Sequence, residues 1–216
     1  MQEIQSILKN ILLPTIQFLA VLIGLLYFSK LKKSYWKWFL IYLIIIFIQE
    51  YFWMKNTSLS REHKIGYYVF FGIPFQYLFL YWLYALKSFK SKKLFLTSSL
   101  IYIGTIIIVA FFKELDEILS LSTNIGTFIL TGLIILEFIK QIKNDDILKF
   151  RENKMFYINI GLVLFYIGNY PYHVFGKELY QSHKDIWDLY QVYFLASNNI
   201  MYLLFAASFK WGKTQS

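Results

Sequence analysis

Six polar side chains stand inside long apolar stretches of this sequence, where lipid or core burial makes a polar group costly to keep. They are Gln17, Glu50, Gln76, Asn169, His173 and Asn198. An amide or imidazole in such a place can donate or accept hydrogen bonds, and a carboxylate can bind a cation or exchange a proton. We therefore hypothesise that the six side chains form one ligand-binding pocket, provided that packing turns them toward each other.

The most unusual local sequence runs from Gly168 to His173 and contains Pro171. Proline has no amide hydrogen to donate, so it predicts a helix kink. A kink frees backbone carbonyl groups, which in lipid must find partners or face a cavity. Asn169 and His173 are four residues apart and share one helix face. This segment is the strongest candidate for a binding site, and the alternative is a kink that only fits helix packing.

The two carboxylates within the apolar stretches also admit structural roles. Glu50 is five residues from Lys55, so it can be a ligand, proton or cation contact, or it can pair with a loop lysine. Glu137 lies three residues before Lys140, a spacing that favours an ion pair on one helix face.

Several catalytic chemistries find no support in the sequence. The chain has no Cys, which excludes thiol catalysis and lipidation of cysteine. No nucleotide-binding, serine-hydrolase or kinase motif occurs. The three histidines, His63, His173 and His183, lack the tight spacing of a zinc site. We predict no catalytic residue, no metal and no cofactor.

The elements that must position these residues are apolar helices. Hydrophobic residues make up 57% of the 216 residues and charged residues only 16%, which excludes an ordinary soluble domain. A membrane-spanning helix needs about 20 apolar residues. The predicted spans are 11–29, 38–54, 65–86, 94–112, 125–142, 156–176 and 189–209. The expected fold is all-α, a polytopic membrane protein with a single domain of seven transmembrane helices over residues 1–216.

The distribution of basic residues predicts the orientation. Most of the 22 Lys and Arg residues precede spans two, four and six or follow span seven. The positive-inside rule makes these segments cytoplasmic, with the N-terminus out and the C-terminus in. We expect a bacterial inner membrane as the location. The net charge of +9 is explained by the same rule, so we expect no direct nucleic-acid binding.

The basic inner segments could also dock a partner. The side chains that we single out are Lys90, Lys92, Lys93, Lys149, Arg151 and Lys154. The alternative is that these residues only enforce topology.

Aromatic and Asn-rich motifs give the chain a resemblance to a known group. The motifs are Phe156-Tyr157-x-Asn159-x-Gly161, Tyr166-x-Gly168-Asn169, Trp187 and Asn199-x-x-Tyr202-x-x-Phe205-x-x-x-Phe209-x-Trp211. They resemble small seven-span membrane proteins from Bacteroidota, a group without an assigned activity. That group usually has Glu where this chain has Gln76, so the resemblance implies no acid chemistry there.

A weaker resemblance, in size and class only, is to the multi-span accessory membrane proteins of type VI-B CRISPR loci. It implies modulation of an RNA-targeting effector in antiviral defence. The leading hypothesis is an accessory or sensory membrane protein that binds a ligand and modulates a cytosolic or membrane partner without catalysis. An intramembrane lipid-modifying enzyme and a small transporter are the alternatives.

Overall fold

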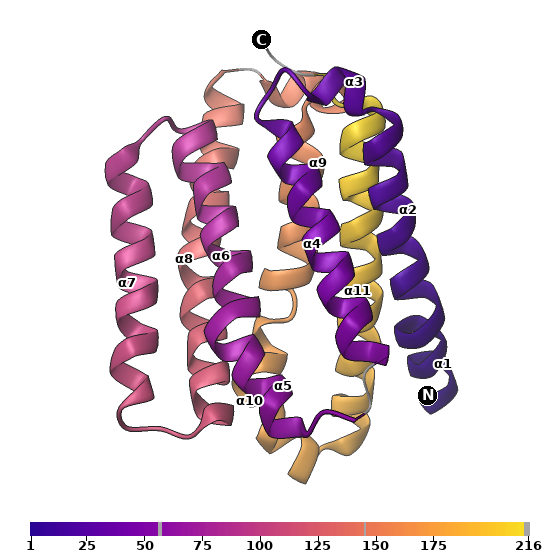
Figure 1. Cartoon of the computed structure of the whole chain (residues 1–216), viewed down its shortest axis with the longest axis vertical. Coiled ribbons are helices and arrows are strands. Elements are labelled where there is room, and N and C mark those ends of the chain that lie inside the picture. The colour runs from indigo at the N-terminus through magenta and orange to yellow at the C-terminus, as the bar shows by residue number, and fades with distance from the viewer. Residues whose placement is uncertain (56–57, 145, 214–216) are drawn as a thin grey trace. The chain divides into compact units, whose positions relative to one another are not determined.

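The computed structural model is almost entirely helical (Figure 1), which confirms the all-α prediction. It describes residues 1–55, 58–144 and 146–213, except for the side chains of residues 54, 55, 146, 147, 173 and 177. Within these ranges, the one β-pairing is an isolated parallel bridge between Asn153 and Lys213.

The N-terminal half contains α1 (Gln2–Ile7), η1 (Leu8–Leu12), α2 (Leu13–Leu26), α3 (Phe28–Leu31), α4 (Trp36–Lys55), α5 (Arg61–Tyr67), η2 (Tyr68–Gly72), α6 (Ile73–Tyr81), η3 (Trp82–Ser88) and α7 (Lys92–Ala110). It is followed by α8 (Leu115–Lys143), η4 (Asp146–Glu152), α9 (Lys154–Leu162), η5 (Val163–Ile167), α10 (Tyr170–Ser182) and α11 (Lys184–Trp211). The segments η1, η2, η3 and η5 are π-helical, so several of these elements join into longer continuous helices.

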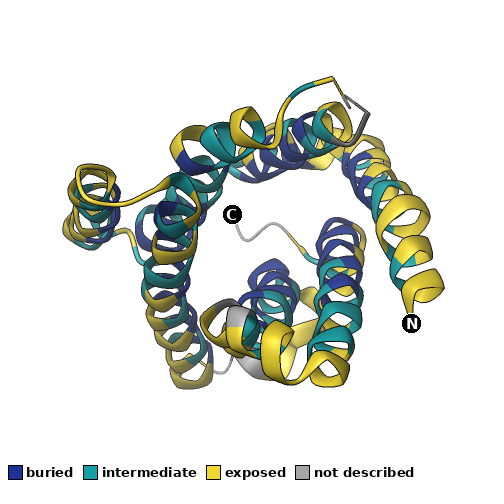
Figure 2. Cartoon of the chain, turned by 90° about the horizontal axis from the view of Figure 1, so that it is seen from below, coloured by how far each residue is buried: buried dark blue, intermediate teal, exposed yellow. Residues whose placement is uncertain are grey.

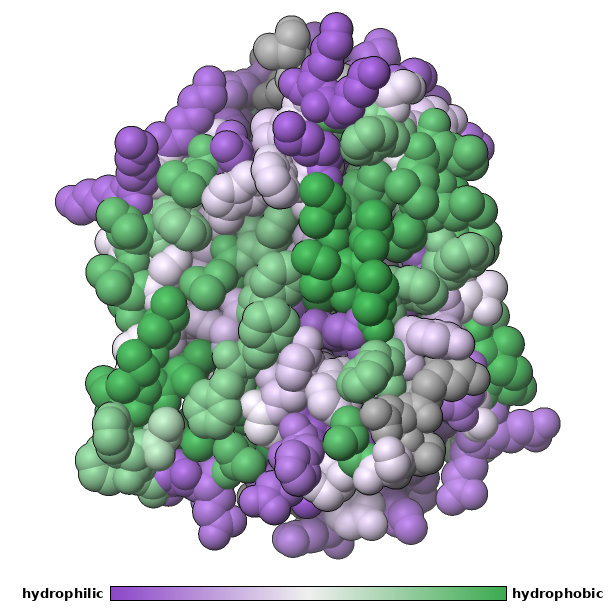
Figure 3. All heavy atoms as spheres, in the orientation of Figure 1, coloured by the Kyte–Doolittle hydropathy of each residue, from purple (hydrophilic) through white to green (hydrophobic). Residues whose placement is uncertain are grey.

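Six of the helices described are long and apolar enough to cross a membrane. They are Gln2–Leu26, Trp36–Trp53, Arg61–Ser88, Lys92–Ala110, Leu115–Lys143 and Lys184–Trp211. Each overlaps one predicted span, and Figure 3 shows apolar residues along the helices with hydrophilic residues at their ends. The remaining predicted span, 156–176, is not among the six.

The predicted span 156–176 is interrupted near its middle. The chain leaves the π-helical turn η5 at Ile167, makes a turn at Gly168 and Asn169, and begins α10 at Tyr170. Pro171 is the second residue of α10, so the predicted kink is present.

All three prolines of the chain follow a π-helical turn. Pro14 is the second residue of α2, directly after η1, and Pro74 is the second residue of α6, directly after η2. Pro171 follows η5 by four residues. A proline ring clashes with the carbonyl group four residues earlier, and a widened preceding turn relieves that clash. The prolines therefore explain where these helices are distorted.

The chain divides into two compact units. The prediction that the chain forms a single domain stays a prediction. The first unit holds Met1–Tyr51 and Lys140–Ser216. Its α11 packs mainly against α9 and α2. The ring of Phe39 on α4 contacts Phe205 and Phe209 of α11 at centroid distances of 5.2 and 5.7 Å. Figure 2 shows that the longer helices bury one side and expose the other, whereas α1 has no buried residue.

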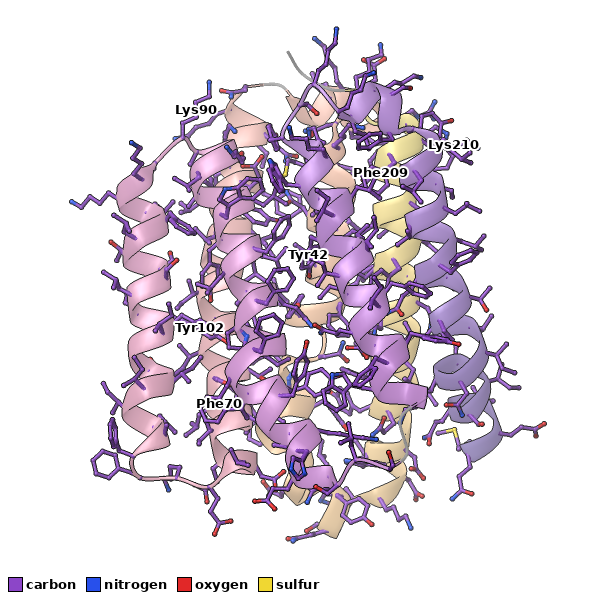
Figure 4. The ribbon with its side chains drawn as sticks, viewed as in Figure 1. Tyr42, Phe70, Lys90, Tyr102, Phe209 and Lys210 are labelled. Atoms are coloured by element: carbon purple, nitrogen blue, oxygen red, sulfur yellow. The ribbon has the colours of Figure 1, made fainter. Side chains whose placement is uncertain are left out.

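The second unit, Phe52–Ile139, has a core of tyrosines. Tyr77 donates to or accepts from Thr127 at 2.7 Å, and Tyr81 donates to the Gly126 carbonyl oxygen at 3.0 Å. Tyr102 reaches in from α7 and packs on both tyrosine rings (Figure 4). These bonds tie α6 to α8 and satisfy hydroxyl groups that would be costly to bury unpaired.

Candidate functional site at the interrupted helix

Asn169 lies at the interruption and is completely buried. Its Nδ2 donates hydrogen bonds to the Phe165 carbonyl oxygen at 2.5 Å and to Ser197 Oγ on α11 at 2.9 Å. Its Oδ1 has no hydrogen-bond partner among the residues described. A buried amide oxygen at this position can accept a hydrogen bond from a bound group.

Side chains of α11 compensate for the distorted backbone. Tyr193 donates its hydroxyl to the Leu164 carbonyl oxygen at 3.1 Å, and Gln191 donates to the Tyr172 hydroxyl at 2.8 Å. Tyr172 also packs against Trp187 of α11. The interruption is therefore a defined structure, held by side chains from the neighbouring helix.

The other predicted pocket residues take different positions. Gln17 is buried on α2, whereas Glu50 on α4 and Asn198 on α11 are half-buried. Gln76 belongs to the second unit, where it is half-buried on α6. The His173 side chain lies outside the described residues. Convergence of the six on one pocket stays a prediction.

Two further polar residues of α11, which lie outside the predicted pocket set, are buried. Ser197 pairs with Asn169, and Asn199, the neighbour of Asn198, is buried. Asn199 donates to the Leu195 carbonyl oxygen at 2.7 Å and more weakly to that of Leu8 at 3.4 Å. Which of the two adjacent asparagines is buried depends on how the helix is rotated about its axis, and the sequence does not give that rotation.

Glu137 is buried in the second unit and accepts a hydrogen bond from the Ser88 hydroxyl. Burial with a hydroxyl donor satisfies part of the carboxylate. The ion pair with Lys140 stays a prediction.

At the other end of α11, the segment η4 exposes both apolar and basic side chains. Leu148 is 77% exposed and Phe150 is 41% exposed, and both alternate with the exposed Lys149 and Arg151. Residues 148–152 line a hollow of about 490 Å³. Exposed apolar residues beside cations are typical of a docking surface for a protein or a membrane.

Lys154 differs from the docking residues with which it was grouped. It is only 3% exposed, and its Nζ donates to the carbonyl oxygens of Ser208 at 2.9 Å and Gly212 at 2.6 Å. Burial, and then the positive charge of Lys30, lower the pKa of Lys154 from 10.5 to about 8. Its ammonium group caps the end of α11 and is not presented to a partner, so we remove it from the docking set.

The three remaining docking candidates belong to the second unit. Lys90, Lys92 and Lys93 are exposed around the start of α7. Lys90 lies in the tight turn after η3 with a φ of 56° (Figure 4).

Comparison with known proteins adds no relative. No family model matches the chain, and no curated protein and no solved structure matches it either. Among the residues described, no group of three His, Cys, Asp or Glu side chains could hold a metal ion. The resemblances to small Bacteroidota membrane proteins and to type VI-B accessory proteins stay predictions.

Proposed function

We propose that this chain is a multi-pass membrane protein that binds a ligand beside Asn169 and modulates a partner that docks at η4. The observation that carries the proposal is that α11 contacts both places. Ser197 of α11 holds Asn169, and the C-terminal end of α11 is held by Lys154, two residues after η4. Binding at the interruption would therefore act on the same rigid helix that supports the docking segment.

The contact with Asn169 lies near the middle of α11, and η4 lies beside its C-terminal end. Ser197 lies 14 residues before the last residue of α11, which is about 21 Å at 1.5 Å per residue. Near its C-terminal end, Lys213 forms an ion pair with Glu152 at 2.6 Å and a β-bridge with Asn153. We infer that a displacement of α11 would be passed to η4 through these contacts.

The interrupted segment supports a seventh crossing. It begins beside the C-terminal end of α11, where Lys154 binds Gly212, and only His183 separates the end of α10 from the start of α11. The segment therefore runs antiparallel to α11 from one end to the other. Together with the six long helices, this supports seven crossings. The positive-inside rule then puts η4 and the C-terminus in the cytoplasm of a bacterial cell.

The chemistry of η4 fits a protein partner. Leu148 and Phe150 offer apolar anchors, and Lys149 and Arg151 offer charge to an acidic surface. Arg151 also lies over the Phe150 ring at 5.9 Å, so a cation and an apolar ring are presented side by side.

The test is affinity purification of the full chain from native membranes in a gentle detergent, with mass spectrometry of proteins and small molecules. We expect one cytosolic protein at a constant ratio to the chain. Leu148→Ser combined with Phe150→Ser should remove it, whereas Ile4→Ser, which changes an exposed apolar residue of α1, should not. A partner retained by the double variant, or no partner at all, would contradict the docking proposal.

The ligand part is tested with Asn169→Leu in the same experiment. The substitution removes the buried acceptor, so a small molecule enriched with the wild-type chain should be lost while membrane insertion is unchanged. A small molecule that stays enriched with this variant would place the ligand elsewhere.

A further inference from the structure

A pocket of about 590 Å³ lies in the second unit, where α5 and α8 begin and α7 ends. Its charged lining consists of Arg61, Glu62, Lys113, Glu114 and Asp116. We call it the α5–α8 pocket. It shares no residue with the site at Asn169, so it is independent of the function proposed above.

The charges in the pocket are only partly paired. Arg61 Nη2 lies 2.8 Å from Asp116 Oδ1, an ion pair that connects α5 to α8. Lys113 Nζ lies 2.9 Å from Glu117 Oε2. Neither Glu62 nor Glu114 has an ion-pair partner in the described part of the chain. The pocket therefore offers two carboxylates to a cation.

The pocket also offers donors to an anion. A guanidinium group has five N–H donors, and one contact with Asp116 leaves others of Arg61 available. Lys113 contributes an exposed ammonium group beside Glu114. A group that carries both a phosphate and an amine would satisfy the cations and the carboxylates together.

The apolar part of the lining points to a lipid. Ile118 is buried. Phe70 lies on η2 and is 58% exposed (Figure 4), so an apolar ring borders the charged part of the pocket. In the loop that carries Lys113, Phe111 and Phe112 are each 79% exposed. Apolar rings at the ends of long apolar helices lie at the depth where headgroups meet acyl chains.

We propose that the α5–α8 pocket binds a phospholipid whose headgroup ends in a primary ammonium group, as in phosphatidylethanolamine. The phosphate contacts Arg61 and Lys113, the ammonium group lies between Glu62 and Glu114, and the acyl chains follow the apolar surface beside Phe70. A choline headgroup has no N–H to donate to the carboxylates, and a glycerol headgroup has no positive charge.

The test uses the full chain, stripped of lipid in detergent and mixed with equal amounts of phosphatidylethanolamine, phosphatidylcholine and phosphatidylglycerol with identical acyl chains. Native mass spectrometry then counts the lipids retained. Because charge-assisted hydrogen bonds are lost with choline, we expect phosphatidylethanolamine to exceed phosphatidylcholine by about three- to tenfold. Equal retention of these two lipids would overturn the proposal.

Two variants and a matched control separate the contributions. Glu62→Gln with Glu114→Gln should bring phosphatidylethanolamine and phosphatidylcholine to within about twofold of each other, because the carboxylates that distinguish them are gone. Arg61→Gln should lower the retention of both, since they share the phosphate. Glu178→Gln changes an exposed glutamate of α10 and should leave the preference intact. A preference that survives the double substitution would overturn the assignment of Glu62 and Glu114.

Soluble phosphoethanolamine distinguishes a lipid site from a site for a free metabolite. Without acyl chains it should displace little lipid at equal concentration. Complete displacement would show that the apolar surface contributes nothing, and would overturn the lipid assignment.

Discussion

The ammonium nitrogen of Lys154 lies 2.6 Å from the carbonyl oxygen of Gly212, so a buried lysine at the start of α9 caps the end of α11. The carbonyl oxygen of Ser208, four residues before Gly212, accepts a second hydrogen bond from the same nitrogen. Carbonyl groups at a helix end lack intrahelical partners, and a cation there also interacts favourably with the helix dipole.

This arrangement predicts a pH dependence. The pKa of Lys154 is about 8 in the folded chain and near 10.5 in the unfolded chain, so between these values the unfolded state binds more protons. The contribution of this group to stability therefore rises with pH across that window. We expect the thermal unfolding midpoint in detergent to rise more from pH 8 to 10.5 in the wild-type chain than in Lys154→Met. Lys149→Met, which alters an exposed lysine, should behave as wild type, and identical profiles for Lys154→Met and wild type would contradict the prediction.

The bond between Asn169 and Ser197 should be measurable as a coupling. A double-mutant cycle with Asn169→Ala and Ser197→Ala should give about 0.6 kcal/mol, the average for side-chain hydrogen bonds between membrane helices. The measurement is equilibrium unfolding of the four proteins in one detergent. Strictly additive effects would show that the bond contributes nothing to stability.

Two glycines on α8 form a matched pair. A Cβ atom at Gly126 would lie 2.6 Å from the Tyr77 ring, whereas one at Gly132 would meet nothing within 4 Å. Gly126→Ala should therefore cost about 1–3 kcal/mol through overpacking, while Gly132→Ala should cost nothing or stabilise the helix. The thermal unfolding midpoints of the two variants in detergent check this, and equal midpoints would mean that Tyr77 can move aside.

The orientation and the seventh crossing can be tested by cysteine labelling, because the chain has no Cys of its own. With seven crossings, a membrane-impermeant reagent should label Lys113→Cys and Lys184→Cys in intact cells. Lys90→Cys and Arg151→Cys should react only after permeabilisation. If Lys184→Cys and Arg151→Cys react from the same side, the interrupted segment does not cross.

The helices could be predicted from the sequence, but their rotation could not. Length and hydropathy located six long helices, and Pro171 located the interruption. A helix that is apolar on all sides gives no amphipathic signal to show which face is buried. The adjacent Asn198 and Asn199 show this, since only the second is buried.

Hydrogen-bond partners that lie far apart in the sequence could not be predicted either. Asn169 was a candidate because Pro171 follows it closely. A serine within an apolar run commonly bonds its own helix backbone, so the sequence did not reveal that Ser197 is the partner of Asn169. Lys154 could not be distinguished from Lys149, because charge alone does not reveal that the ammonium group meets carbonyl oxygens of α11.

The pairing of each proline with a widened turn has a consequence for how this chain tolerates change in length. A π-helical turn holds one residue more than an α-helical turn, so every residue beyond it is advanced by about 100° around the helix axis. Tyr77 lies three residues after Pro74, beyond the wide turn η2. Pro74 therefore determines the direction in which Tyr77 points around the helix axis. Replacing Pro74 removes the reason for the wide turn, and deleting one residue of η2 is then the compensating change that keeps Tyr77 facing α8.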